Sequence, residues 1–215
     1  MTTKIGILGS GEVARALGNG FLQHGYDVMV GSRDPKKLSD WQAQSKGKGK
    51  VGTFQEAAAY GNSIVLSVKG NAAESLVKSI APQLAGKTIM DTTNPITDAP
   101  PKNGVLSFFT TLDDSLLERL QRMAPTAHFV KTFNTVGSDV MVNPRFSEGK
   151  PTMFICGNHD QAKKEVSGIL DLFGWEVADM GTVEAARAIE PLCILWCIPG
   201  FLQNQWTHAF KLLKP

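Results

Sequence analysis

The chain has 215 residues, of which 42% are hydrophobic, and its formal net charge is +2. This length allows a full hydrophobic core, and we expect one α/β domain with a modest C-terminal addition. The charge is too balanced to indicate nucleic acid or an anionic membrane surface as the main partner.

The cysteines and the apolar pattern bear on the cellular compartment. Three cysteines, an odd number without a paired framework, indicate a reducing cytoplasm. Residues 1–3 lead directly into the first predicted strand, which leaves no room for a signal peptide. The longest apolar stretch, residues 191–202, is interrupted by Pro199-Gly200 and is too short to span a bilayer. We therefore expect a cytoplasmic protein without a membrane partner.

The first predicted strand, residues 4–8, is followed by a glycine turn and a helix. Gly9 permits backbone angles that are closed to other residues, and Gly11 has no side chain to keep a pyrophosphate away. The first N–H groups of the helix point at the anion. Gly9-x-Gly11-x-x-Ala14 is the G-x-G-x-x-A form of the dinucleotide-binding turn. A plain tight turn is the alternative, but the flanking strand and helix favour a nucleotide site.

The second predicted strand, residues 26–30, indicates which dinucleotide binds. NAD-binding proteins place an acid near the end of this strand for the ribose hydroxyls. Here Ser32 and Arg33 follow instead, and both can donate to a 2′-phosphate, while Lys37 adds positive charge. Asp34 suits the cap of the next helix. The pattern predicts NADP(H); the alternative is that Arg33 is an ordinary surface charge.

Strands and helices alternate through the next part of the chain. This alternation predicts a doubly wound parallel sheet with right-handed crossovers, in which ligands lie beyond the carboxyl ends of the strands. The expected strands are residues 51–53, 64–68, 87–90 and 127–131, and the expected helices are residues 54–59, 72–80 and 112–123.

Polar, turn-forming loops follow the later strands and would form one mouth with the glycine turn. Asn94 and Asn134 have amides that can donate to a carboxamide or a ribose. The alternative is that they are turn residues that bond their own backbone. The cofactor-binding residues expected from these loops are Ser67, Val68, Lys69, Asn94, Pro95, Asn134, Thr135, Val136 and Gly137.

The C-terminal part is predicted as strand 151–156, helix 161–173, strand 175–178 and helices 183–196 and 201–213. We assign residues 1–180 to an NADP-binding Rossmann domain and residues 181–215 to a helical segment packed on it. This tail is apolar and aromatic around Trp196, Phe201 and Trp206, and such a surface normally finds cover. A dimer face, core packing and a wall for a flat ring are the alternatives.

Several other chemistries lack their residues. Neither tyrosine has a lysine four positions later, and no G-x-S-x-G motif is present, so the sequence indicates neither short-chain dehydrogenase nor acyl-transfer chemistry. Cys193 and Cys197 lie on one predicted helical face without nearby histidines, which indicates buried cysteines rather than a metal site. No residue is assigned a catalytic role.

The sequence resembles the NADPH-dependent F420 reductase family over nearly its whole length. It also resembles the cytoplasmic oxidoreductase domain of six-transmembrane metalloreductases. The motifs that carry the resemblance are Ile5-Gly6-Ile7-Leu8-Gly9-Ser10-Gly11, Val30-Gly31-Ser32-Arg33, Asp91-Thr92-Thr93-Asn94-Pro95, Lys131-Thr132-Phe133-Asn134-Thr135 and Ala186-Arg187-Ala188-Ile189-Glu190-Pro191-Leu192.

The resemblance implies the positions of the nucleotide and of a second ring. It implies Ser10, Glu12 and Val13 at the pyrophosphate and Ser32, Arg33 and Lys37 at the 2′-phosphate. Residues 134–137 would lie near the nicotinamide, and the C-terminal segment would help to seat the second ring. It also implies a homodimer, which we assign to the apolar C-terminal helices.

The resulting hypothesis is a cytoplasmic NADPH-dependent oxidoreductase that transfers a hydride between NADP(H) and a ring acceptor. The acceptor would be the deazaflavin coenzyme F420 or a flavin, FMN or FAD. Hydride transfer between two rings needs contact between them and little else from the protein. Two alternatives stay open: a reductase of a small imine or carbonyl, and a non-catalytic NADP(H) sensor.

Overall fold

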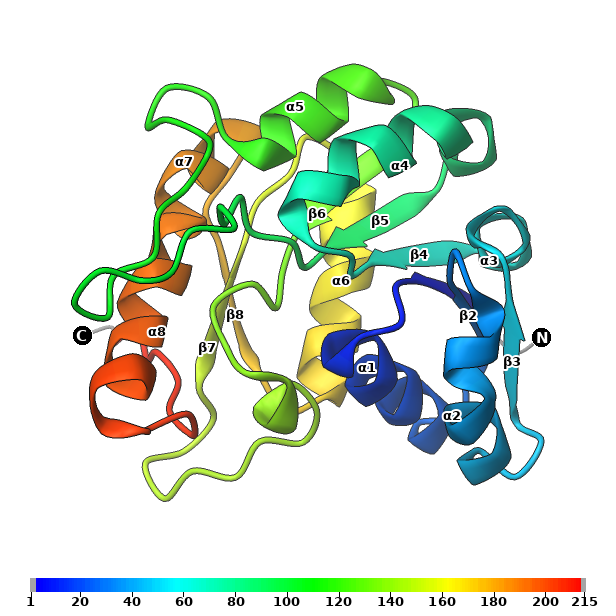
Figure 1. The fold of residues 1–215 in the computed structure, drawn as a ribbon, viewed down its shortest axis with the longest axis horizontal. Helices are drawn as coiled ribbons and strands as arrows, with labels where there is room; N and C mark the ends of the chain where they lie inside the picture. The colour runs from blue at the N-terminus through cyan, green and yellow to red at the C-terminus, as the bar shows by residue number, and fades with distance from the viewer. Residues whose placement is uncertain (1–2, 214–215) are drawn as a thin grey trace.

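The computed structural model describes residues 3–213 and shows a parallel sheet between two layers of helices (Figure 1). Within these residues, six parallel strands pair in the order β3-β2-β1-β4-β5-β6. The order reverses between β1 and β4, as in the doubly wound fold, so the predicted α/β architecture is confirmed. The strands are β1 (Lys4–Leu8), β2 (Asp27–Gly31), β3 (Gly49–Gly52), β4 (Ser63–Leu66), β5 (Thr88–Asp91) and β6 (His128–Lys131).

Helices cover the two faces of the sheet and form a separate apolar core on each. Leu17, Phe21 and Val166 belong to the core under α1 and α6. Ala57 and Val77 belong to the core under α3, α4 and α5. Burial on both faces explains why the central strands are apolar runs rather than alternating sequences. The helices are α1 (Glu12–Gln23), α2 (Ser39–Gln44), α3 (Phe54–Tyr60), α4 (Gly70–Leu84), α5 (Leu116–Met123) and α6 (Asp160–Leu172).

Local capping decides where several helices begin. Ser115 and Glu118 form a reciprocal capping box, so α5 begins at Leu116 and not at residue 112, where the apolar pattern placed its start. Asp34 accepts a hydrogen bond from the Lys36 amide at 3.2 Å, at the start of the 3-10 turn η1 (Pro35–Leu38). The predicted capping role of Asp34 is therefore confirmed.

The later strands form a separate element beside the main sheet. β7 (Thr152–Ile155) and β8 (Glu176–Asp179) pair in parallel with each other. An isolated bridge between Lys131 and Cys156 connects this pair to the end of β6. The small sheet therefore lies on the side of the molecule that also carries the C-terminal helices (Figure 1).

The C-terminal helical part continues further than predicted and then stops. It runs through η3 (Val183–Ala185), α7 (Ala186–Ile189) and α8 (Pro191–Gln203), and Pro199 does not end it. Asn204 then adopts a left-handed conformation with φ of 55°, which terminates the helix. The predicted helix over 201–213 is wrong, because residues 204–213 have no regular structure and fold back on α8.

One helical stretch passes a length and composition test for crossing a membrane. Residues Val183–Gln203 span 21 residues with mean hydropathy 1.4, and 39% of the tested window is buried inside the structure. From the sequence, we expected this region to be too short to span a bilayer because only residues 191–202 form an apolar stretch. The helix is longer than this stretch. Core helices of other proteins pass the same test. The absence of a membrane partner therefore stays a prediction.

Candidate functional site

The glycine turn lies between the end of β1 and the start of α1. Gly9 has φ of 154°, and its amide donates to the carbonyl oxygen of Gly31 at 3.0 Å. A Cβ atom at Gly9 would lie 2.5 Å from the Ser67 carbonyl oxygen, so only glycine fits between β1 and β4. Gly11 occupies the cap position of α1, and no side chain within residues 3–213 caps the first N–H groups of this helix. These N–H groups are available to an anion.

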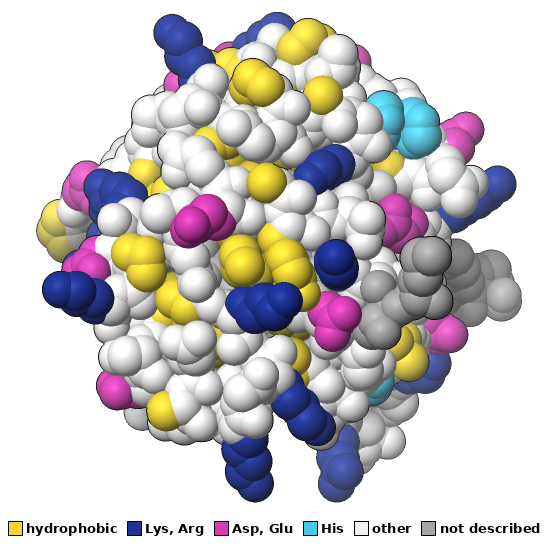
Figure 2. Space-filling view, turned by 90° about the vertical axis from the view of Figure 1, so that its right-hand side faces the viewer, with side chains coloured by type: hydrophobic (Ala, Val, Ile, Leu, Met, Phe, Trp, Pro, Cys, Tyr) yellow, Lys and Arg dark blue, Asp and Glu magenta, His cyan; other side chains and the backbone are white. Residues whose placement is uncertain are grey.

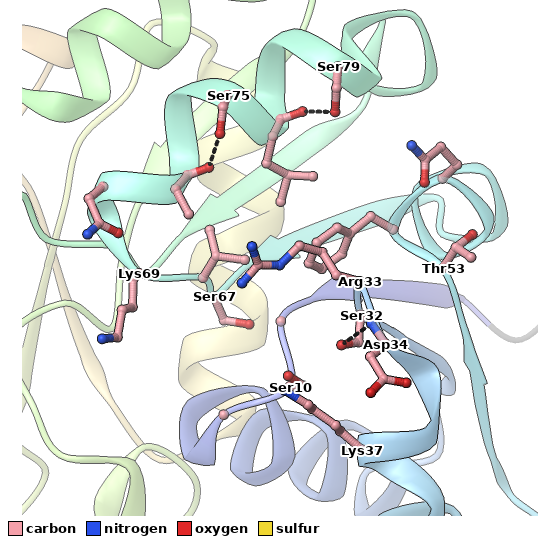
Figure 3. Close-up of a pocket in the computed structure, with 18 residues that line it drawn as sticks. Ser10, Ser32, Arg33, Asp34, Lys37, Thr53, Ser67, Lys69, Ser75 and Ser79 are labelled. Atoms are coloured by element: carbon pink, nitrogen blue, oxygen red, sulfur yellow. Dashed lines mark hydrogen bonds between the residues drawn. The ribbon is translucent and has the colours of Figure 1, made fainter.

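The end of β2 brings the predicted phosphate-binding residues to the same place. Ser32 is buried, and its hydroxyl oxygen accepts a hydrogen bond from the Asp34 amide at 3.2 Å. Arg33 is exposed and projects across the cavity toward the side that carries Ser67, whereas Lys37 points toward the turn at Ser10 (Figure 3). Two cationic side chains, Arg33 and Lys37, and the hydroxyl group of Ser32 therefore lie beside the glycine turn.

These residues line a cavity of about 810 Å³ at the carboxyl ends of β1, β2 and β4. In the structure, the glycine turn, the end of β2 and the loop after β4 meet at this cavity, and their binding of a nucleotide stays a prediction. The predicted residues that line it are Gly9, Ser10, Gly11, Ser32, Arg33, Lys37, Ser67, Val68 and Lys69.

One wall of the cavity was missed by sequence reasoning. The exposed face of α4 forms it, opposite the face whose residues Ala73 and Val77 are in the core. The signal was present in the sequence, because small and polar residues recur along this helix at helical spacing. The missed lining residues of this wall are Asn71, Ala72, Ser75, Leu76 and Ser79, and those missed elsewhere are Asp34 before η1 and Thr53, Phe54 and Gln55 at the start of α3.

The remaining predicted cofactor residues lie outside the walls of this cavity. They are Glu12, Val13, Asn94, Pro95, Asn134, Thr135, Val136 and Gly137. Asn94 and Asn134 hydrogen-bond to each other: Asn94 Nδ2 donates to the Asn134 carbonyl oxygen at 2.8 Å, and Asn134 Nδ2 donates to Asn94 Oδ1 at 3.1 Å. These amides therefore link two loops of the framework. Contact of these loops with the nicotinamide stays a prediction.

The charges around the cavity suit an anionic ligand. Arg33, Lys37 and Lys69 line it together with one acid, Asp34. Among its described lining residues there is no histidine, cysteine, tyrosine or glutamate. A search of residues 3–213 finds no group of three or more residues that could hold a metal ion. The lining thus suits the binding of an anion.

A buried lysine lies deeper, at the carboxyl end of β6. Lys131 Nζ lies 2.6 Å from Asp91 Oδ2 and 2.9 Å from Glu190 Oε1, and all three side chains are buried. Burial alone lowers the pKa of Lys131, but the two carboxylates outweigh it and raise the pKa above its ordinary value. This ammonium is therefore a fixed charge, and sequence reasoning gave it no role.

On the face shown in Figure 2, basic side chains lie at several separated places among acidic and apolar ones. This face is the side of the molecule that carries β3 and α3 in Figure 1. This face therefore does not carry an electrostatic field of a single sign.

The comparisons with known proteins agree with this geometry. Residues 4–95 match the model of the family described as NADP oxidoreductase, coenzyme F420-dependent. The chain is 33% identical to metalloreductase STEAP3 of Rattus norvegicus over 207 residues, which cover 93% of this chain. It is 25% identical to the F420-dependent NADP reductase of Methanocaldococcus jannaschii over 178 residues, covering 77% of this chain and 78% of that protein.

Among solved structures, one from Arthrobacter sp. FB24, described as a candidate F420-dependent NADP reductase, has a TM-score of 0.91 and 28% sequence identity. The two chains cover each other completely. The chain spans 39% of the length of the rat metalloreductase that it matches. The similarity to that metalloreductase therefore concerns a part of it.

Proposed function

We propose that this chain, whose residues 4–95 match the model of the family described as NADP oxidoreductase, coenzyme F420-dependent, transfers a hydride between NADP(H) and a planar ring acceptor. The acceptor would be coenzyme F420 or a flavin. One observation carries the nucleotide half of the proposal: the cavity joins an uncapped glycine turn to Ser32, Arg33 and Lys37.

The lining residues can hold the pyrophosphate and the 2′-phosphate of NADP(H) at separate places. The turn from Gly9 to Gly11 and the start of α1 would receive the pyrophosphate, while Ser32, Arg33 and Lys37 would receive the 2′-phosphate. Hydrogen bonds to charged groups contribute roughly 1.5–3 kcal/mol each, so two of them favour NADP(H) over NAD(H) by about two to four powers of ten.

Hydride transfer between two rings needs contact between the rings and no dedicated proton donor from the protein. NADPH would supply the hydride with its two electrons to the acceptor ring, a proton from solvent would complete the reduction of that ring, and NADP⁺ would be released. The protein's contribution to this step is to hold the rings in contact and exclude water. We place the nicotinamide toward the loops of residues 94–95 and 134–137, beyond the phosphate-binding residues.

The experiment that tests this function follows NADPH oxidation by absorbance with coenzyme F420, FMN and FAD in separate assays. NADH serves as the control donor, at the same concentration. We expect turnover with one of the ring acceptors and with NADPH rather than NADH. No turnover with any ring, despite measurable NADPH binding, would contradict the proposal.

The two alternatives make different predictions in the same assay. A reductase of a small imine or carbonyl needs a proton donor, so its turnover would depend steeply on pH. A non-catalytic NADP(H) sensor would bind NADPH tightly and would not oxidise it, whichever acceptor is supplied. Turnover with a ring acceptor that changes little with pH favours hydride transfer between rings over both.

We also propose that a second copy of this chain covers the apolar surface at the end of α8. Leu195, Phe201 and Leu202 are exposed there, and Trp206 stacks edge to face on Phe201 with ring centroids 5.2 Å apart. Sedimentation should show a dimer that dissociates in a Leu195→Glu/Leu202→Glu double variant. Leu172→Glu, which changes an equally exposed leucine of α6, should leave the dimer intact.

A reducing cytoplasm is the compartment that we propose. Cys156, Cys193 and Cys197 are all free thiols and are buried in the structure. Burial raises the pKa of Cys156 to about 12, so this thiol stays protonated. A tagged full-length chain that is found in a cell fraction other than the cytosol would contradict this proposal.

A further inference from the structure

Asp91, Lys131 and Glu190 form a buried network of charges, in which Asp91 Oδ2 has the Lys131 ammonium at 2.6 Å as an ion-pair partner but accepts no hydrogen bond. The Lys131 ammonium lies within 2.9 Å of both carboxylates and donates to the Thr93 carbonyl oxygen at 2.9 Å. Asp91 Oδ1 accepts hydrogen bonds from the amide and the hydroxyl of Thr93. The network thus fixes the end of β5 to the end of β6.

Glu190 connects this pair of strands to two helices. It is the residue before Pro191, the first residue of α8. Its two carboxylate oxygens accept hydrogen bonds from the amides of Leu116 and Leu117, each at 3.0 Å, at the start of α5. The Lys131 ammonium balances only one of the two carboxylate charges. The positive N-terminal end of α5 compensates part of the other one. One buried side chain therefore holds the starts of α5 and α8 and the Lys131 ammonium together.

The same junction reaches the predicted acceptor side of the site. Asn134 Nδ2 donates to the carbonyl oxygen of Ile189, the residue before Glu190, at 3.2 Å. Asn134 also bonds to Asn94, so the loops after β5 and β6 are tied to the start of α8. In contrast, the phosphate-binding residues of the glycine turn and of β2 are not part of this network.

Apolar side chains in place of Asp91, Lys131 and Glu190 would avoid the cost of desolvating three charges. Buried ionic groups are best attested where they select one arrangement of packed elements. We propose that Glu190 is a positioning residue, which acts through Lys131 and Asp91 to dock α8 and the loops of residues 94–95 and 134–137 in one arrangement on the sheet. The kinetic consequence rests on the proposed hydride transfer, whereas the docking itself does not.

The variant Glu190→Gln keeps the shape of the side chain and removes its charge. Hydrogen exchange, measured on the full chain, should become at least about tenfold faster over residues 132–137 and 191–203 and stay unchanged over residues 4–53. The Kd for NADPH should change by less than about threefold. The rate of hydride transfer to the ring acceptor should fall by at least about tenfold, because small displacements between reacting rings are costly.

The matched control is Glu118→Gln. Glu118 pairs with Arg187 at 2.6 Å and also joins α5 to the C-terminal part, but it does not bond the loops after β5 and β6. Its variant should leave hydride transfer within about twofold of the wild type, since the rings keep their positions. A milder variant of the network, Thr93→Val, removes the hydroxyl donor to Asp91 and should give a smaller effect in the same segments.

Two results would overturn the inference. One is that Glu190→Gln and Thr93→Val leave exchange over residues 132–137 and 191–203 unchanged or accelerate it equally along the whole chain. The other is that they lower NADPH affinity and transfer rate by the same factor. If the wild type reduces no ring acceptor, the proposed function fails, and the exchange pattern still decides whether Glu190 docks α8.

Discussion

The amide of Gly9 donates a hydrogen bond to the carbonyl oxygen of Gly31 at 3.0 Å. This bond joins the glycine turn after β1 to the last residue of β2, directly before Ser32 and Arg33. A second link holds η1 in place, because the Arg15 guanidinium donates to the Lys37 carbonyl oxygen at 2.7 Å. The proposed pyrophosphate and 2′-phosphate sites are therefore connected to each other by hydrogen bonds.

Replacing Arg33 with alanine should weaken NADPH binding much more than NADH binding. The loss of one charge-assisted contact to the 2′-phosphate corresponds to roughly 1.5–3 kcal/mol, or about one to two powers of ten in the Kd for NADPH. Lys36→Ala is the matched control, because Lys36 belongs to the same η1 turn as Lys37 but does not line the cavity. Titration by fluorescence measures both nucleotides. Equal losses for NADPH and NADH would refute the assignment of Arg33.

The two glycines of the turn should respond differently to alanine. A Cβ atom at Gly11 meets nothing within 4 Å among the described residues, and its φ of −80° is open to alanine. Gly11→Ala should keep its unfolding free energy and bind NADPH at least about tenfold more weakly, because the methyl group occupies the pyrophosphate position. Gly9→Ala should lose about 1–3 kcal/mol of stability through strain against Ser67. A Gly11→Ala variant with wild-type affinity would contradict the site.

The Glu118–Arg187 pair predicts a pH dependence of stability. Hydrogen bonds from Arg187, and then from Ser115, lower the pKa of Glu118 from 4.5 to about 2, although burial alone raises it. A carboxylate with a depressed pKa in the folded state contributes stability above its unfolded pKa. This contribution should therefore fade as the pH drops from about 4.5 to about 2.

The variant Glu118→Gln isolates the contribution of the Glu118 charge to stability, because glutamine preserves the capping box at the start of α5. Urea unfolding at a series of pH values should show a constant difference between wild type and variant above about pH 5 and a shrinking difference below pH 4.5. A difference that does not change with pH would show that the pair contributes no charge-dependent stability.

Replacing Gly200 with alanine should detach the C-terminal tail. A Cβ atom at Gly200 would lie 2.3 Å from the ring of Trp206, so the ring must leave α8. We expect faster proteolysis within residues 204–213 and a red shift of tryptophan emission, with little loss of stability in the sheet. Gly168→Ala is the control: it lies in α6, where a Cβ atom meets none of the described atoms within 4 Å, and should stabilise by up to about 1 kcal/mol. A tail that stays protected in Gly200→Ala would contradict the packing.

The residues that meet at the cavity could be predicted from the sequence because they lie close to strand ends. Gly9 and Ser32 follow directly on β1 and β2, Gly11 and Arg33 come shortly after them, and the order of strands in a doubly wound sheet brings those ends together. The α4 wall was harder to predict, because the helical pattern of Ser75 and Ser79 indicates an exposed face without saying what lies opposite it.

The proposed acceptor half of the site depends on contacts between residues far apart in the sequence. Nothing local to Asn94 indicates that it bonds to Asn134, and nothing local to Lys131 indicates that Glu190 pairs with it. The tail shows the same limit, since its apolar residues suggested a helix over 201–213. The left-handed Asn204 and the contact of Trp206 with Gly200 set a different path.

Single-turnover reduction with NADPH deuterated at the transferring position of the nicotinamide tests whether a hydride passes from NADPH to a ring. The enzyme is mixed with each ring acceptor in turn, and NADH is the control donor. We expect acceptor reduction at the same rate as NADPH oxidation, slowed by the deuterium, and little reaction with NADH. Two results would contradict hydride transfer to a ring. One is that NADPH binds tightly but reduces no ring acceptor. The other is that deuterium does not slow the reaction although the chemical step is shown to be rate-limiting.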